Sequence, residues 1–166
     1  MKVNIALLTV TDTRTIDNDK SGGILVNKIK EADHNLIDRK ICKDNKDDIV
    51  VILKDWLSNK KIDAIITTGG TGLTGRDITP EALNEIADKH IPGFGEMFRY
   101  ISIKSVGTSS IQSRACAVLS NGKYVFALPG SSGGVTDAWE EILKYQLDIN
   151  HKPCNFVELF PRLKEK

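Results

Sequence analysis

The sequence predicts an α/β protein built on a mostly parallel sheet, and three observations lead to this prediction. Short apolar runs rich in β-branched residues alternate with longer segments whose apolar positions recur every three or four residues. Glycine-bearing turns stand where several of these strands pass into helices. Such alternation is typical of right-handed βαβ units, in which helices cover both faces of a parallel sheet.

The first half of the chain contains three predicted strands and two predicted helices. The strands are short and apolar, as expected for buried members of a parallel sheet. The helices are recognised by apolar residues at a spacing near 3.6. In chain order these elements are strand Asn4–Val10, a helix beginning after Gly22 and Gly23 and continuing to Ala32, strand Leu36–Cys42, helix Asp44–Lys60 and strand Asp63–Thr68.

The second half adds two helices and a hairpin. Thr79, Pro80 and Glu81 supply a capping residue, a proline at the first helical position and a favourable acid, so a helix is expected from there to about Asp88. A tight turn is expected between two antiparallel strands, followed by a last helix. These elements are strands Ala115–Leu119 and Lys123–Leu128 around Asn121 and Gly122, and helix Val135 to about Gln146.

Composition excludes several classes of function. The 166 residues suit one domain spanning 1–166, and 23 basic against 22 acidic residues give a net charge of +1, so no nucleic acid or anionic membrane partner is expected. Without a long apolar span or a cleavage signal, the chain is expected to be soluble and cytoplasmic. Cys42, Cys116 and Cys154 lack metal or redox spacing and are interpreted as structural thiols, the alternative being a nucleophile that needs a nearby histidine.

Three glycine-bearing loops are the main candidates for ligand binding. Each joins a strand to a helix at the carboxyl end of the predicted sheet, where open α/β sheets bind ligands. Glycine lets the backbone approach an anion, and the following helix offers free amides. The alternative is that glycine serves only the conformation of each turn. The loops are Ser21-Gly22-Gly23, Gly69-Gly70-Thr71-Gly72 and Pro129-Gly130-Ser131.

Two familiar nucleotide-binding motifs do not account for the central loop. Residues 70–75 spell G-x-G-x-x-G, but they follow the third strand rather than the first, and the acid expected to hold a ribose is not at the right place. A P-loop requires a lysine followed by serine or threonine, where this chain has Arg76 and Asp77.

Asp44 and Asp77 are candidate magnesium ligands. Each follows a predicted strand, so both carboxylates should emerge at the edge of the sheet that carries the glycines. Magnesium usually takes one or two carboxylates and completes its shell with phosphate and water. The alternative is that Asp44 caps its helix and Asp77 orders its loop. Ser113 and Arg114 offer a hydroxyl and a cation for a phosphate or the polar edge of a ring.

A long motif, Thr67 to Ala82 (TTGGTGLTGRDITPEA), resembles the signature of the MoaB and Mog family of molybdenum cofactor biosynthesis proteins. Further matching segments follow in order over essentially the whole chain. The Phe-Gly-Glu-Met-Phe-Arg run and the closing Pro-Cys-Asn-Phe resemble the MoaB branch in particular. These segments are Ser21-Gly22, residues 91–99, 112–115 and 127–131, and Pro153 to Phe156.

The resemblance implies a fold and an activity. The fold is a three-layer α/β/α sandwich, mostly parallel with one antiparallel strand, and family members form homotrimers or homohexamers. The activity is adenylylation, in which the terminal phosphate of molybdopterin attacks the α-phosphate of MgATP to give adenylyl-molybdopterin and pyrophosphate. One alternative is a paralogue that binds molybdopterin without chemistry, and another is an unrelated nucleotide-dependent enzyme on the same architecture.

The resemblance also implies roles for individual residues. It assigns catalysis with Mg²⁺ to Asp44 and Asp77. The residues implied to bind molybdopterin are Ser21, Gly22, Gly70, Thr71, Gly72 and Ser113. The residues implied to face the ATP nucleotide are Pro129, Gly130 and Ser131.

Overall fold

A six-stranded sheet in the order β2-β1-β3-β6-β5-β4 runs through the centre of the protein. The computed structural model describes residues 1–165. The strands are β1 (Asn4–Val10), β2 (Asn35–Cys42), β3 (Ala64–Thr68), β4 (Lys89–His90), β5 (Cys116–Ser120) and β6 (Lys123–Leu128).

The strand directions confirm the predicted mixed sheet. β1 pairs in parallel with β2 and β3, and β3 pairs in parallel with β6. Only β5 runs the other way, antiparallel to both β6 and β4. The hairpin between β5 and β6 turns at Asn121 and Gly122, whose φ angles of +47° and +71° are those of the expected tight turn.

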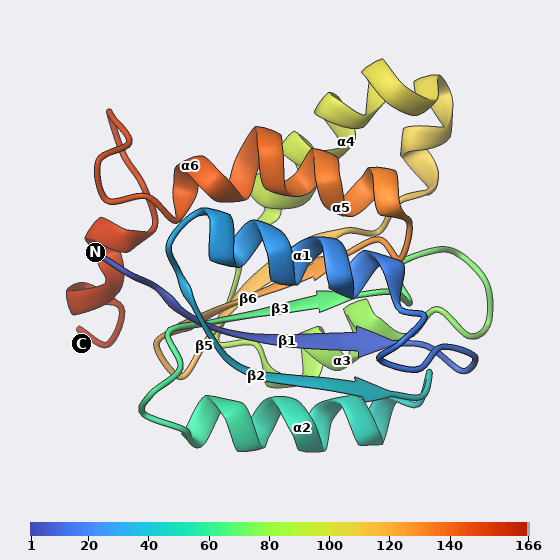
Figure 1. Ribbon diagram of the computed structural model, residues 1–166, viewed down its shortest axis with the longest axis horizontal. Helices are drawn as coiled ribbons and strands as arrows, with labels where there is room; N and C mark the ends of the chain where they lie inside the picture. Colours follow the sequence, from blue (N-terminus) through green and yellow to red (C-terminus); the bar gives the residue numbers. More distant parts are fainter. Residues whose placement is uncertain (166) are drawn as a thin grey trace.

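Helices cover both faces of the sheet, which gives the expected three layers (Figure 1). One face carries α1, α4, α5 and α6, and the other carries α2 and α3. The helices are α1 (Lys20–Glu31), α2 (Lys46–Ser58), α3 (Thr79–Ile86), α4 (Pro92–Val106), α5 (Ser132–Ala138) and α6 (Lys144–Gln146), with 3₁₀ helices η1 (Gly107–Gln112) and η3 (Val157–Arg162).

Alternating side chains of the strands form two separate cores. On β1, Ile5 and Leu7 belong to the core that includes residues of α1, α4 and α5, whereas Ala6 and Leu8 belong to the core that includes residues of α2 and α3. Because successive side chains of a strand point to opposite faces, a strand buried on both sides must be apolar throughout. This requirement explains the unbroken apolar run at the start of the sequence.

Three predicted helices differ from the structure in how they begin or continue. Helix α1 begins at Lys20, so Gly22 and Gly23 lie in its first turns rather than before it, because buried Asp19 accepts a hydrogen bond from the Gly22 amide and caps the helix. Thr79 does not cap α3. It is the first helical residue, and its hydroxyl donates instead to the Gly69 carbonyl at 2.8 Å. The last predicted helix is interrupted by a π-helical segment at Trp139–Leu143.

Helix α4 was not predicted. Its buried face includes Phe94, Phe98 and Ile101, but Met97 and Tyr100 are also apolar and exposed, so no single apolar stripe stands out. Tyr100 is 70% exposed in the single chain.

The chain leaves neighbouring strands toward opposite faces of the sheet. β1 leads to α1 on one face, whereas β3 leads to α3 on the other (Figure 1). A crevice is expected outside the carboxyl ends of two strands whose connections diverge in this way. Across residues 1–165, no helix is both long and apolar enough to cross a membrane.

Candidate functional site

A cavity of about 580 Å³ opens at the carboxyl ends of β1, β3 and β6, where the connections diverge. It brings together residues from segments far apart in the sequence. The predicted site residues that line it are Asp44, Gly70, Thr71, Gly72, Asp77, Ser113, Pro129, Gly130 and Ser131. Gly69, from the predicted central loop, also lines it, and the lining residues that were not predicted are Thr9, Val10, Thr11, Thr13, Arg14, Thr68 and Gln112.

The central loop can take its shape only with glycines. Gly69 and Gly70 have φ angles of +104° and +67°, and a Cβ on Gly69 would lie 2.2 Å from the carbonyl oxygen of Val10. Among residues 1–165, the amides of Gly70, Thr71 and Gly130 donate no hydrogen bond. Amides without an internal acceptor are available to water or to an anionic ligand.

Both candidate carboxylates lie against this loop. A Cβ on Gly70 would be 3.3 Å from Oδ1 of Asp44, and a Cβ on Gly72 would be 2.7 Å from Oδ2 of Asp77. The sequence expectation that the two acids emerge beside the glycines therefore agrees with their positions. The alternative for Asp44 does not hold, because Asn45 is the cap of α2 and accepts from the amide of Asp48.

Asp44 stands in a negative environment. Burial raises the pKa of its carboxyl, and the nearby charges of Asp12 and Asp77 raise it further. Its backbone amide donates to Asp12 at 3.2 Å, which holds the loops after β1 and β2 together. The charge of Arg76 lowers the pKa of Asp44 but does not outweigh burial and the two acids. A carboxylate crowded by two others in this way is suited to a divalent metal ion, which would relieve the repulsion.

Asp77 is held differently. Its Oδ2 accepts from the amide of Thr74 at 2.8 Å and from the Thr74 hydroxyl at 2.7 Å. Partial burial raises the pKa of Asp77, but these bonds, the Gly72 amide and the charge of Arg114 outweigh burial and leave the pKa below its ordinary value. Asp77 thus orders its loop, as the alternative interpretation required, while also lining the cavity. The two acids have pKa values shifted in opposite directions, which suits different tasks.

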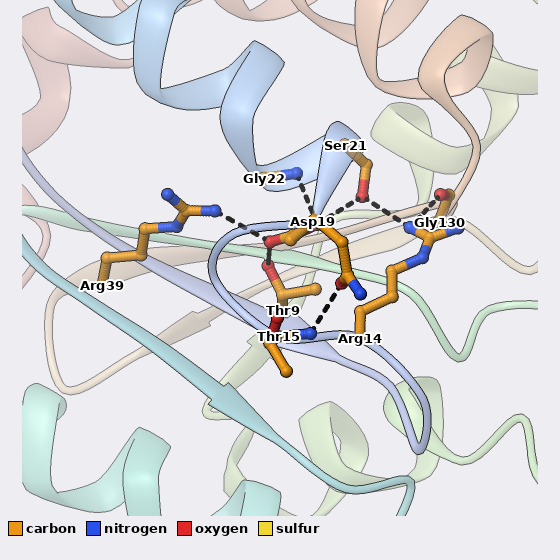
Figure 2. Close-up of polar contacts among 9 residues, drawn as sticks. Thr9, Arg14, Thr15, Asp19, Ser21, Gly22, Arg39 and Gly130 are labelled. Atoms are coloured by element: carbon orange, nitrogen blue, oxygen red, sulfur yellow. Dashed lines mark hydrogen bonds and ion pairs between the residues drawn. The ribbon is translucent and has the colours of Figure 1, made fainter.

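Ser21 and Gly22 do not line the cavity. They are buried beside Asp19, which Figure 2 shows at the centre of a polar cluster. Oδ1 of Asp19 accepts from the Gly22 amide at 2.9 Å and the Ser21 hydroxyl at 3.3 Å. Its Oδ2 accepts from the Thr9 hydroxyl at 2.6 Å and from Arg39 at 3.0 Å. A Cβ on Gly22 would lie 2.0 Å from that Oδ2, so this glycine is explained by the cap.

Arg14 is a lining residue that sequence reasoning did not select. Its Nη1 donates to the Ser21 hydroxyl at 3.3 Å and to the Gly130 carbonyl at 3.2 Å, so it bridges two of the predicted loops (Figure 2). It is the one arginine or lysine among the described residues that line the cavity. The sequence feature that could have indicated Arg14 is the polar run Thr11 to Arg14, which directly follows the first strand. A guanidinium there can pair with phosphate oxygens.

Ser113 and Arg114 have separate environments. Ser113 lines the cavity, and Arg99 holds its carbonyl through a 3.3 Å hydrogen bond. Arg114 does not line the cavity and is not free to bind a phosphate, because its guanidinium donates to Gly72, Asp77 and Glu81. The sequence interpretation of Arg114 as a ligand-binding cation was therefore wrong.

The arrangement suits phosphate chemistry that needs no protein nucleophile. Within residues 1–165, no group of three or more histidine, cysteine or acidic residues could hold a metal ion by itself. Two carboxylates remain, which match the number that magnesium takes when phosphates complete its shell. Burial raises the pKa of Cys42 to about 12 and that of Cys116 to about 11, so neither thiol is a nucleophile at neutral pH.

Comparisons with known proteins identify the family of this chain. Residues 6–149 match the family profile described as "Probable molybdopterin binding domain". The chain is 42% identical over 161 residues to molybdenum cofactor biosynthesis protein B of Escherichia coli (strain K12), covering 97% of this chain and 93% of that one. It is 44% identical over 149 residues to the protein of that name from Staphylococcus aureus (strain COL), covering 88% of each.

Solved structures of proteins with related names have a similar fold. A crystal structure of molybdenum cofactor biosynthesis protein B is similar over 100% of this chain and 98% of that one, with a TM-score of 0.89 and 35% identity. The crystal structure of tungsten cofactor synthesizing protein MoaB from Pyrococcus furiosus is similar over 86% of this chain and 91% of that one, with a TM-score of 0.77 and 32% identity.

Proposed function

Because this chain belongs to the MoaB and Mog family of molybdenum cofactor biosynthesis proteins, we propose that it binds molybdopterin in the cavity beside Gly70 and adenylylates it with MgATP. The terminal phosphate oxygen of molybdopterin bonds to the α-phosphorus of ATP while the bond from that phosphorus to the bridging oxygen of pyrophosphate breaks. The products are adenylyl-molybdopterin and pyrophosphate. The observation that supports this reaction most directly is the position of Asp44 and Asp77 against one glycine loop in which the amides of Gly70 and Thr71 donate no hydrogen bond within the described residues.

The chain's own residues bind and orient the two phosphorylated substrates. Gly70, Thr71 and Gly72, together with Ser113, receive the molybdopterin, and Ser21 acts indirectly by holding Arg14. The second wall of the cavity receives the nucleotide through Pro129, Gly130 and Ser131. Arg14 bonds to the Gly130 carbonyl, so its charge lies where the phosphates of the nucleotide would enter. Phosphoryl transfer of this kind depends mainly on positioning and charge neutralisation.

Asp44 and Asp77 are the residues that would hold Mg²⁺. The negative charges that raise the pKa of Asp44 make this corner of the cavity favourable for a divalent cation. When bound, Mg²⁺ would neutralise charge on the phosphates of ATP. Asp44 is the better position for a test, because replacing Asp77 would also release Thr74 and loosen the loop.

The test is pyrophosphate release from ATP in the presence of molybdopterin and Mg²⁺, with molybdopterin binding measured separately by calorimetry. We expect Asp44→Asn to bind molybdopterin nearly as well as the wild type and to release pyrophosphate roughly 10²–10³ times more slowly, since a positioned charge stabiliser is lost. Asp48→Asn, an exposed acid in the first turn of α2, is the matched control and should retain full activity.

The outcomes separate the alternatives. Wild-type protein that binds molybdopterin but releases no pyrophosphate would be the non-catalytic binding paralogue. Protein that binds ATP or NAD but not molybdopterin would be an unrelated nucleotide-dependent enzyme. Either result removes the adenylyltransferase proposal.

We further propose that the protein assembles as a homotrimer or homohexamer. Exposed apolar side chains gather on α4 and η1 and would be buried by such contacts. They are Met97, Tyr100, Ile103, Val106 and Ile111. Light scattering coupled to size-exclusion chromatography should give three or six times the chain mass of 18.3 kDa, and the mass of one chain would contradict the proposal.

A further inference from the structure

Arg114 connects two segments that line the cavity, through its backbone and its side chain. Its amide donates to the carbonyl of Thr71 at 2.9 Å. The same residue directly follows Ser113, which also lines the cavity. The segment that carries Ser113 is thereby fixed against the loop that carries the glycines.

The guanidinium of Arg114 binds that loop at two further points and helix α3 at a third. Nε donates to the Gly72 carbonyl and Nη2 to the Asp77 carbonyl, each at 2.7 Å. Nη1 donates to the carboxylate of Glu81 in the first turn of α3. The two carbonyls mark the beginning and the end of the turn that positions the Asp77 side chain. A planar guanidinium reaches three acceptors in fixed directions, which a lysine ammonium cannot do.

Among the described residues, the side chains of the turn between these carbonyls make one hydrogen-bonded contact outside the turn, the exposed ion pair of Arg76 with Asp12 at 3.1 Å. Asp77 accepts from the Thr74 amide at 2.8 Å, and the Asp77 amide donates to the Thr74 carbonyl at 3.0 Å. Leu73 and Gly75 are exposed, and Leu73 is 66% accessible, so neither packs on the core. The direction of the Asp77 carboxylate therefore depends on where Arg114 holds the two ends of the turn.

We propose that Arg114 is a positioning residue that sets the Asp77 carboxylate and the glycine loop against Ser113, and so shapes the site without touching a substrate. This inference rests on the proposed function for its catalytic consequence only. The placement of the loop can be measured without activity.

The experiment compares Arg114→Lys, which keeps the charge and loses the planar group, with Arg162→Lys as the matched control. Arg162 is exposed and pairs only with Glu165 among the described residues. Amide hydrogen exchange is followed by NMR at Thr74, whose amide donates to Asp77, and at Ile66 in the centre of the sheet. In Arg114→Lys, exchange at Thr74 should accelerate about tenfold or more while Ile66 is unchanged, because only local opening is affected.

A second variant, Glu81→Gln, removes the ion pair while leaving both carbonyl bonds, and it should leave exchange at Thr74 close to the wild-type rate. Unchanged exchange at Thr74 in Arg114→Lys would overturn the inference, as would equal acceleration at Ile66 or an equal effect of Glu81→Gln. If the wild type is active, Arg114→Lys should lower kcat about tenfold or more with KM for ATP nearly unchanged. A lack of wild-type activity would remove the proposed reaction but not the exchange result.

Discussion

Replacement of Asp19 by asparagine should destabilise the protein by about 3 kcal/mol, and the structure shows how this value arises. Asparagine keeps an oxygen at the Oδ1 position, which accepts from Gly22 and Ser21, so most of the cap is retained. At the Oδ2 position an NH₂ group replaces the acceptor of Thr9 and Arg39. The lost charged bond to Arg39 costs about 1.5–3 kcal/mol and the neutral bond to Thr9 about 1 kcal/mol.

Urea denaturation measures this change, with Asp17→Asn as the matched control. Asp17 is exposed and accepts no hydrogen bond from the described residues, so its replacement should alter the free energy of unfolding by roughly 0.5 kcal/mol or less. For a domain of this size, Asp19→Asn should also lower Tm by roughly 6–12 °C. A loss below about 1 kcal/mol would show that the cluster contributes little beyond the cap, and would refute the reasoning.

The same carboxylate predicts a dependence on pH. Burial raises the pKa of Asp19, but the bonds from Thr9, Gly22 and Arg39 outweigh burial and leave it below its ordinary value of 3.8. A folded-state pKa below the unfolded one adds stability that is present above the unfolded pKa and is lost as pH falls through the folded one. The wild type should therefore lose stability below about pH 4 more steeply than Asp19→Asn. Equal slopes for the two proteins would count against this account.

Two other predictions concern the loops and the thiols. Gly70→Ala should lower the affinity for molybdopterin in calorimetry and destabilise the protein by about 1–3 kcal/mol in urea. The reason is that φ of Gly70 is +67° and the new Cβ would lie 2.4 Å from Oγ1 of Thr79. Unchanged affinity would argue against a ligand beside this glycine. At pH 8, iodoacetamide should label exposed Cys154 and spare Cys42 and Cys116, because burial raises the pKa values of these two thiols to about 12 and about 11. Peptide mass spectrometry measures the labelling, and equal labelling of all three cysteines would contradict this prediction.

The layers and the sheet were predictable because their signals are local. The apolar run at β1 and the turn at Asn121 and Gly122 each specify a structure within a few residues. Helix α4 escaped prediction because its exposed side is also apolar, so periodicity could not separate a buried face from an exposed one. Its exposed apolar residues are what the proposed assembly would explain.

The site was predicted in part for a related reason. Glycines and acids that follow strands converge at one sheet edge, so Gly70, Asp44 and Asp77 could be placed from sequence. The direction of a side chain in an irregular segment leaves no such pattern. Arg14 lines the cavity and Arg114 does not. The role of neither arginine could be assigned without knowing which carbonyl groups surround its guanidinium.

The divergence of the chain after β1 and β3 has a mechanical consequence. The residues that line the cavity lie mainly in loops, and these loops lead into helices that belong to two cores separated by the sheet, so each side of the rim is supported by its own set of packed side chains. Looser packing in one layer would shift the loops on that side of the cavity and leave the loops on the other side in place relative to the strands. The width of the opening therefore depends on how the two layers are placed relative to each other. Packing defects far from any ligand would change how well the cavity fits that ligand.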